Sequence, residues 1–226
     1  MGLADGVVNG ARVSTVLVLP KGPLVYLANP KTATQSIRAV LRPLSLTVGP
    51  FGDLHNRHMP YPTFDKEWRA LTEKLLGHPV ETLVVVRDPF ERLESWFRYR
   101  HRNPEGAENS TRGISFDDFA RAAALGDQAP VFAKVGDQAR FAGWDGLQAG
   151  VTHVFDHARL DLLVDFLQRR LACRIRLPQR NISPPAELLG LAPLSEEARA
   201  VYRASRPGEF ALYAAVARQG SLHRSP

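Results

Sequence analysis

Short apolar runs alternate along the chain with segments whose apolar residues recur every three or four positions. The clearest run is TLVVV, from Thr82 to Val86, which we expect to be a strand buried on both faces. Leu24 to Ala28 has the same character, and a further strand is expected over Arg12 to Leu19. Strands of this kind, separated by helices, are typical of a mostly parallel sheet covered by helices on both faces.

A helix is predicted after each of the two buried runs. After the first, Ala33, Ile37, Val40 and Leu41 follow a helical period, and Pro43 should end the helix.

After the second run, Asp88 suits the N-cap position, Pro89 the first helical position and Glu91 the capping-box position. This helix should extend to about His101. Its apolar face is formed by Phe90, Leu93 and Phe97.

The rest of the chain continues the alternation. The remaining expected elements are a strand over Leu44 to Val48, a loop over Gly49 to Thr63, a short helix capped by Asp65 and reaching Leu76, a loose polar loop over Asn103 to Gly113, helices over Phe116 to Leu125 and Asp137 to Phe141, a strand over Val151 to Phe155, and helices over Leu160 to Leu171, Ser195 to Ala204 and Glu209 to Arg218.

Composition indicates one globular domain over residues 1–226. The chain is 44% hydrophobic and 23% charged, which is the profile of a folded protein with its own core. A single cysteine, Cys173, excludes an internal disulfide. The first residues lack the basic and apolar segments of a signal peptide, and no apolar run is long enough to span a bilayer. We therefore expect a cytoplasmic protein with no membrane partner.

The formal net charge of +6 favours an anionic partner. The arginines are scattered, without a tract of like charges or interleaved aromatic residues, so nucleic acid is not the expected partner. The pattern does not define an oligomeric state.

The first strand-to-helix junction has the residues of an anion site. The segment Asn29 to Ser36 reads NPKTATQS and combines one lysine, Lys31, with several hydroxyls and the free N–H groups of a helix start. It contains no glycine and is not the GxxxxGK[ST] loop that holds a triphosphate. The alternative for this segment alone is an ordinary capped helix.

The second junction offers a guanidinium and a hydroxyl. Arg87 ends the buried strand, and Ser95 lies eight residues later on the following helix, roughly opposite its apolar face. Together they suit a phosphate dianion. The alternatives are a salt bridge from Arg87 to Asp88 or Glu91, and a solvated position for Ser95.

The two junctions together resemble a known family. PKTATQSI and VVVRDPFERLESWF resemble the 5′-phosphosulfate loop and the 3′-phosphate motif of sulfotransferases, with closest similarity to the carbohydrate group that includes heparan 2-O-sulfotransferases and short bacterial relatives. GDQARFAGW, VFDHARLDLLVDFLQRRL, RNISP and LSEEARAVYRASRPGEFALY resemble later segments of that group. Ala33 and Gln35 depart from it, since many relatives carry Gly and Ser or Thr there, and RPGEF replaces a common ending.

This resemblance implies a fold, a donor and a donor site. The fold would be a three-layer α/β sandwich like that of P-loop kinases, and the donor 3′-phosphoadenosine 5′-phosphosulfate (PAPS), released as adenosine 3′,5′-bisphosphate (PAP). Lys31 would stabilise the leaving phosphate, and Arg87 and Ser95 would bind the 3′-phosphate, with Arg180 and Asn181 completing that pocket. The 5′-phosphate would be held by the hydroxyls of Thr34 and Ser36 and by the backbone N–H groups of Thr32, Ala33, Thr34, Gln35 and Ser36.

A histidine base is also implied. The segment RHMPY resembles the one that supplies the base in the 2-O-sulfotransferase group, which selects His58, with His55 as the alternative or an orienting partner. His153 and His157 are expected to be structural. No Cys or carboxylate joins His55 and His58 at a convincing ligand spacing, so no metal site is expected.

Two other functions stay open at the level of sequence. One is a nucleotide-dependent kinase of related fold, and the other is a non-catalytic module that binds an adenine bisphosphate or an anionic polymer. The acceptor is expected to be a small molecule or saccharide, and arginines and histidines in the loops at Gly49 to Thr63 and His101 to Gly113 favour an anionic one.

Overall fold

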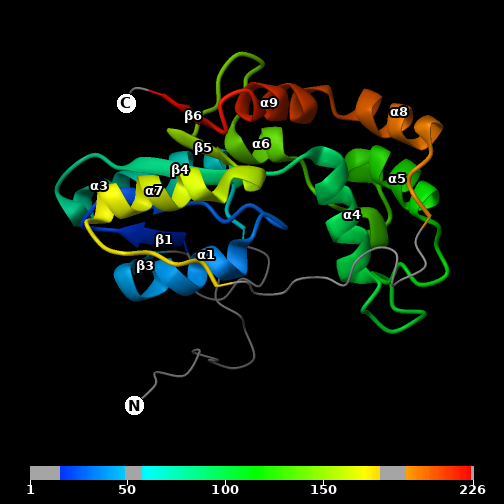
Figure 1. The fold of residues 1–226 in the computed structure, drawn as a ribbon, viewed down its shortest axis with the longest axis horizontal. Coiled ribbons are helices and arrows are strands. Elements are labelled where there is room, and N and C mark those ends of the chain that lie inside the picture. Colours follow the sequence, from blue (N-terminus) through cyan, green and yellow to red (C-terminus); the bar gives the residue numbers. More distant parts are fainter. Residues whose placement is uncertain (1–15, 49–57, 179–191, 225–226) are drawn as a thin grey trace.

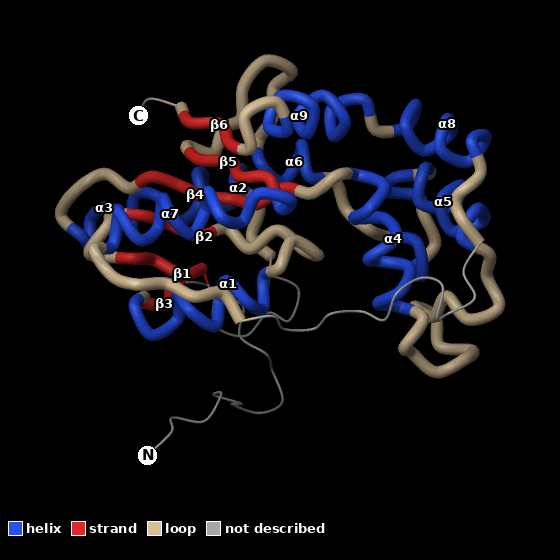
Figure 2. The backbone as a smooth tube through the Cα atoms, in the orientation of Figure 1, coloured by secondary structure: helices blue, strands red, loops and turns tan. Residues whose placement is uncertain are grey.

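A mixed sheet lies at the centre of the computed structural model, which describes residues 16–48, 58–178 and 192–224. Within these residues the sheet has six strands in the order β3-β1-β2-β4-β5-β6 (Figures 1 and 2). The strands are β1 (Val16–Leu19), β2 (Leu24–Tyr26), β3 (Leu46–Val48), β4 (Glu81–Val86), β5 (His153–Asp156) and β6 (Ser221–His223).

The central strands are parallel and the outer ones antiparallel. β4 runs parallel to β2 and to β5, with Val85 opposite Phe155. β1 is antiparallel to β2 and β3, and β5 to β6. The sheet is thus less parallel than the mostly parallel one predicted from the sequence: of its five described strand pairs, only the two in the centre are parallel. The last strand, β6, was not predicted, because its three residues show no clear alternation of apolar and polar side chains.

Helices cover both faces of the sheet, which explains why its strands are apolar throughout. Alternate residues of β4 point to opposite sides: Leu83 and Val85 pack against α1 (Thr34–Leu41) and α7 (Leu160–Leu171). Val84 and Val86 face α6 (Gln138–Ala142) and α9 (Pro207–Ala217). The α/β sandwich expected from the sequence is confirmed.

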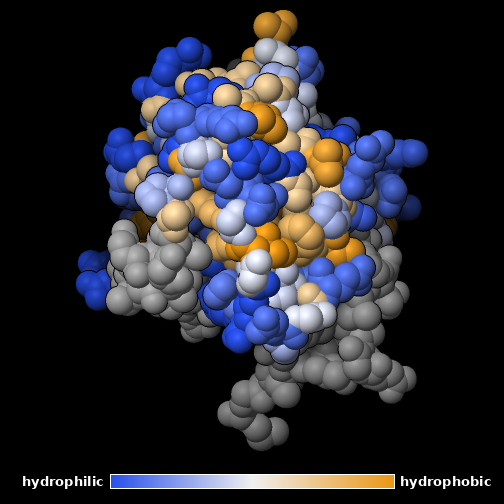
Figure 3. Space-filling model, turned by 90° about the vertical axis from the view of Figure 1, so that its right-hand side faces the viewer, coloured by the Kyte–Doolittle hydropathy of each residue, from blue (hydrophilic) through white to orange (hydrophobic). Residues whose placement is uncertain are grey.

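A third core lies beside the sheet. α4 (Pro89–Arg100), α5 (Phe116–Ala124) and α8 (Glu196–Ser205) pack around Leu93, Phe97, Phe119 and Tyr202, and these helices stand together at one end of the molecule (Figure 1). Seen from that end, apolar side chains interrupt the polar surface (Figure 3).

The segment before β4 differs from expectation. Asp65 does not cap a helix: the helix already begins at α2 (Tyr61–Thr63) and continues through a π-helical turn, η2 (Phe64–Trp68), into α3 (Arg69–Leu76). Pro62 in the first turn supplies the start, and Asp65 instead pairs with Arg69 at 2.5 Å.

The loop from residue 103 to 113 is better anchored than its polar composition suggests. Asn103 Nδ2 donates to the Asn109 side chain at 2.9 Å, and the buried Thr111 hydroxyl donates to the Phe97 carbonyl at 3.0 Å. The remaining short helices are η1 (Arg42–Leu44), η3 (Gly126–Gln128), η4 (Val131–Ala133) and η5 (His157–Arg159). None of the helices in the described part of the chain combines the length and apolar character needed to cross a bilayer.

Candidate donor site

The carboxyl ends of β2 and β4 bring the two predicted junctions to one edge of the sheet. β2 leads into the turn before α1, and β4 leads through Arg87 into α4. Because the two strands are parallel neighbours, the helix starts that follow them lie side by side, which is where open α/β sheets bind ligands.

The turn after β2 has an unusual backbone. Lys31 and Ala33 both have left-handed conformations, with φ values of 68° and 59°, which cost a residue with a side chain about 1–2 kcal/mol each. Two contacts hold the turn: the buried Thr32 hydroxyl donates to the Asn29 carbonyl at 2.7 Å, and Arg92 Nε donates to the Pro30 carbonyl at 3.2 Å. Strain held in place by its surroundings is common at ligand sites.

The turn opens α1 without a side-chain cap. Ala33 is the N-cap residue, and the first turn of α1 contains no acidic residue. Of the predicted 5′-phosphate residues, Ser36 is buried, Thr34 is half-buried and Gln35 is exposed. An uncapped N-terminus without a carboxylate suits a bound anion.

Lys31 faces the second junction. Its Nζ lies 4.1 Å from the ring centre of Tyr99 and 5.7 Å from that of Trp96, both on α4. Burial, followed by the charges of Arg102, Arg87, Arg98 and Arg100, lowers the pKa of Lys31 to about 8. The structure thus brings the predicted Lys31 and Arg87 into one electropositive region.

The start of α4 matches its prediction closely. Asp88 is the N-cap residue and accepts from the N–H groups of Phe90 and Glu91, and Pro89 begins the helix. Glu91 does not turn back to the cap. Its carboxylate instead accepts from Arg87 Nε at 3.0 Å, one of the two salt bridges considered for this arginine.

Ser95 is buried rather than solvated, with 7% of its surface exposed. α4 is covered on more than one side, since Arg92 and Arg100 are buried as well as its apolar residues. Within the described residues, the Ser95 hydroxyl has no hydrogen-bond partner, and the Arg87 Nη atoms make no hydrogen bond or ion pair. Both groups can therefore take a ligand oxygen.

His58 lies at the same edge of the sheet. Its Nδ1 is 2.6 Å from the carbonyl oxygen of Ala28, just beyond β2. A carbonyl only accepts, so Nδ1 carries the proton and Nε2 is the basic nitrogen of the neutral ring. His55, Arg180 and Asn181 fall outside the described residues.

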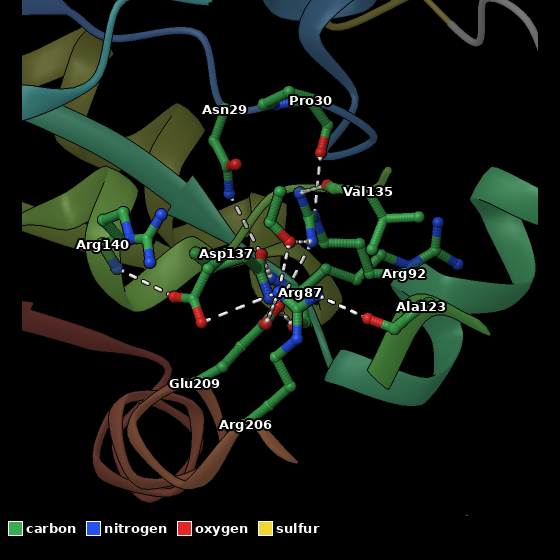
Figure 4. A network of polar contacts seen from close by, with 12 residues as sticks. Asn29, Pro30, Arg87, Arg92, Ala123, Val135, Asp137, Arg140, Arg206 and Glu209 are labelled. Carbon is green, nitrogen blue, oxygen red and sulfur yellow. Dashed lines mark hydrogen bonds and ion pairs between the residues drawn. The ribbon is translucent and has the colours of Figure 1, made fainter. Parts of the chain in front are cut away.

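Several side chains that support the site escaped the sequence analysis. Arg92, 2% exposed, pairs with the buried Glu209 of α9 at 3.2 Å and also donates to the Val135 carbonyl at 2.8 Å (Figure 4). Arg206 donates to the carbonyls of Gly136 and Ala123. The only sequence signal for the burial of Arg92 is its place beside the apolar stripe of its helix. Its partners could not be predicted, because contacts between residues so distant in sequence leave no local pattern.

The two histidines assigned structural roles lie at opposite edges of the sheet. His153 bonds to Glu81 at 2.6 Å and to His223 at 2.9 Å, at the start of β4 and β5. His157 follows β5 on the donor side, where burial and then the charge of Arg87 lower its pKa to about 4. His157 therefore borders the candidate site. Among the described side chains, no three or more His, Cys, Asp or Glu residues are grouped so as to bind a metal ion.

Comparison with known proteins agrees with the fold and the two junctions. A family model described as "Sulfotransferase family" matches residues 14–174, a span that includes both helix starts, Gln138 and β5. The chain belongs to the sulfotransferase family. A search of curated proteins and a search of solved structures each found no match to the chain.

Proposed function

We propose that the protein transfers the sulfuryl group of PAPS to an acceptor hydroxyl, such as that of a saccharide. The observation that supports this donor best is the position of Lys31: it lies on the turn after β2 and faces α4, whose start and first turns carry Arg87 and Ser95. A lysine beside an uncapped helix start suits the 5′-phosphosulfate, and the arginine with an unpartnered hydroxyl suits a 3′-phosphate.

The chemistry would be an in-line displacement, in which the protein positions the reactants and stabilises charge. The acceptor oxygen forms a bond to sulfur as the bond from sulfur to the 5′-phosphate oxygen breaks. The protonated Lys31 meets the charge that develops on that leaving oxygen. PAP would leave as the second product.

His58 is the proposed base. Its Nδ1–H is held by the Ala28 carbonyl, so Nε2 would take the acceptor proton, as in other oriented histidine bases. His55 stays the alternative. A cytoplasmic location, the carbohydrate-type group and an anionic acceptor stay predictions, as do the roles of Arg180 and Asn181.

Calorimetric titration with PAP, AMP and ATP tests the donor site. We expect PAP to bind far more tightly than AMP or ATP, and Arg87→Ala to remove that preference while Arg169→Ala keeps it. Arg169 is an exposed arginine on α7, on a covering helix, and controls for the loss of one positive charge. Preferential binding of ATP with phosphate transfer would instead indicate a kinase.

Turnover tests the catalytic roles. With PAPS and a panel of hydroxyl acceptors, Lys31→Ala and His58→Ala should abolish transfer, while circular dichroism confirms that both variants fold. Full activity in either variant would refute the role of that residue. Tight PAP binding without transfer to any acceptor would favour a binding module.

A further inference from the structure

The side chain of Gln138 connects the two junctions directly. Gln138 is the first residue of α6 and is 1% exposed. Its Oε1 accepts from Asn29 Nδ2 at 3.0 Å and from the backbone N–H of Arg87 at 2.9 Å, and its Nε2 donates to the Arg87 carbonyl at 2.8 Å. One amide thus bonds to the first residue of each candidate phosphate turn.

These bonds act where no strand of the described sheet pairs with the backbone of Arg87. The ladder between β4 and β5 ends at Val86 and Asp156, and β2 ends at Tyr26, so the backbone of Arg87 lies beyond the sheet. Gln138 supplies the backbone N–H of Arg87 with an acceptor and its carbonyl with a donor, as a neighbouring strand would. The direction in which Arg87 leaves the sheet therefore depends on α6.

The same amide determines the position of the other turn. Asn29 donates both to Gln138 and to the carbonyl of Val85, at 2.9 Å. The turn that presents Lys31 is consequently tied to the end of β4 as well as to α6.

α6 is itself held firmly. Its N-cap residue Asp137 accepts from the N–H of Arg140 at 2.8 Å. The preceding Gly136 has a left-handed φ of 68°, and its carbonyl accepts from Arg206 at 2.8 Å. Gln138 therefore extends from a fixed support, which is the requirement for a residue that sets a distance.

We propose that Gln138 is a positioning residue that fixes the separation of the two phosphate sites and so selects a nucleotide phosphorylated at both the 5′ and the 3′ position. This inference rests on the proposed donor. A ligand with two anionic ends gains affinity from the second end only when the two sites lie at the matching distance. A loosened spacing would reduce that gain and leave each separate site able to bind one phosphate.

The test compares PAP with its two halves, adenosine 5′-phosphate and adenosine 3′-phosphate, by calorimetry. Gln138→Met removes all three hydrogen bonds, and Gln138→Asn shortens the side chain by one methylene, so that its amide no longer reaches all three partners, without adding a charge. The matched control is Gln168→Met, since Gln168 on α7 also binds a backbone N–H, that of Ile175.

We expect Gln138→Met to weaken PAP binding by about tenfold or more, and binding of each monophosphate by less than about threefold. Gln138→Asn should change the ratio in the same direction to a smaller extent, which keeps the test available if the methionine variant does not fold. Gln168→Met should leave the ratio unchanged.

Two results would overturn the inference alone. Equal losses for all three ligands would mean that Gln138 only maintains the fold, and an unchanged advantage of PAP in both variants would mean that it sets no distance. If the unmodified protein shows no preference for PAP over either half, the proposed donor fails and this inference fails with it.

Discussion

Arg87 has an acidic neighbour in the structure and is also the proposed ligand of a phosphate. Its Nε is paired with Glu91, whose carboxylate is more than half exposed, while its two Nη atoms make no hydrogen bond or ion pair within the described part of the chain. Glu91 can therefore orient the guanidinium or compete with the phosphate for it. Because the Glu91 carboxylate is exposed to solvent, a pair of this kind is worth about 1 kcal/mol or less, so an incoming dianion can readily dominate.

Neutralising this carboxylate should strengthen nucleotide binding. In Glu91→Gln the repulsion between the side chain and a 3′-phosphate is lost, and we expect the affinity for PAP to rise roughly two- to fivefold, in line with the small worth of such pairs. Calorimetry at low salt measures the change. Glu67→Gln, an exposed residue of η2, controls for net charge. A decrease in affinity would show that Glu91 orients Arg87.

The lowered pKa of Lys31 predicts coupling between binding and protons. With a pKa of about 8, the lysine of the ligand-free protein loses its proton as the pH rises through 8. A bound phosphate favours the charged form and raises the pKa, so binding should take up a proton above pH 8, and affinity should decline there by up to about tenfold per pH unit.

Titration at pH 8.5 in buffers of different ionisation enthalpy measures this proton uptake. Lys31→Arg keeps the positive charge at all these pH values, so its proton uptake should vanish. The same uptake in that variant would assign the proton to another group.

At the scale of elements, the turn before α1 adopts left-handed backbone without a single glycine. The Thr32 hydroxyl and Arg92 hold this conformation, and the sequence contains no local sign of it. The capped start of α4, in contrast, was predictable because Asp88 and Pro89 act within their own helix turn. Local side-chain chemistry shows in sequence, and contacts made across the fold do not.

Replacement of alanine by glycine should therefore have different effects on stability at two positions, one in the turn before α1 and one inside α1. Ala33→Gly relieves a left-handed residue with φ of 59° and should leave stability unchanged or raise it by up to about 1 kcal/mol. Ala39→Gly, inside α1, should lower it by about 1 kcal/mol. Urea unfolding monitored by circular dichroism compares the two. Similar destabilisation at both positions would contradict the strained turn.

At the scale of the whole molecule, the buried pair of Arg92 and Glu209 joins the candidate donor site to the C-terminal helices. Arg92 contacts the turn before α1 through Pro30, while Glu209 lies on α9 with no exposed surface. Burial raises the pKa of Glu209, and the charge of Arg92 opposes that rise. The position of the turn before α1 therefore depends on this buried pair.

Removing one partner should cost much more than removing both. We expect Arg92→Met to lower the free energy of unfolding by about 3–5 kcal/mol, because it leaves the Glu209 carboxylate buried without its main partner. Arg92→Met combined with Glu209→Gln should recover a substantial part. Denaturation of the two single variants and the double variant at pH 7 measures this. Additive losses would show that the two side chains are not coupled.

The sequence by itself determined the order of most elements, the burial of β4 on both faces, the cap of α4 and the two junctions with Lys31 and Arg87. These features follow from period, capping and turn chemistry, which act over a few residues. Only the tertiary structure decided that β6 joins the sheet, that Ser95 is buried, and that Gln138 bonds to both junctions. Those features depend on which distant segments pack together, because a buried amide or guanidinium is satisfied by partners that local sequence does not specify.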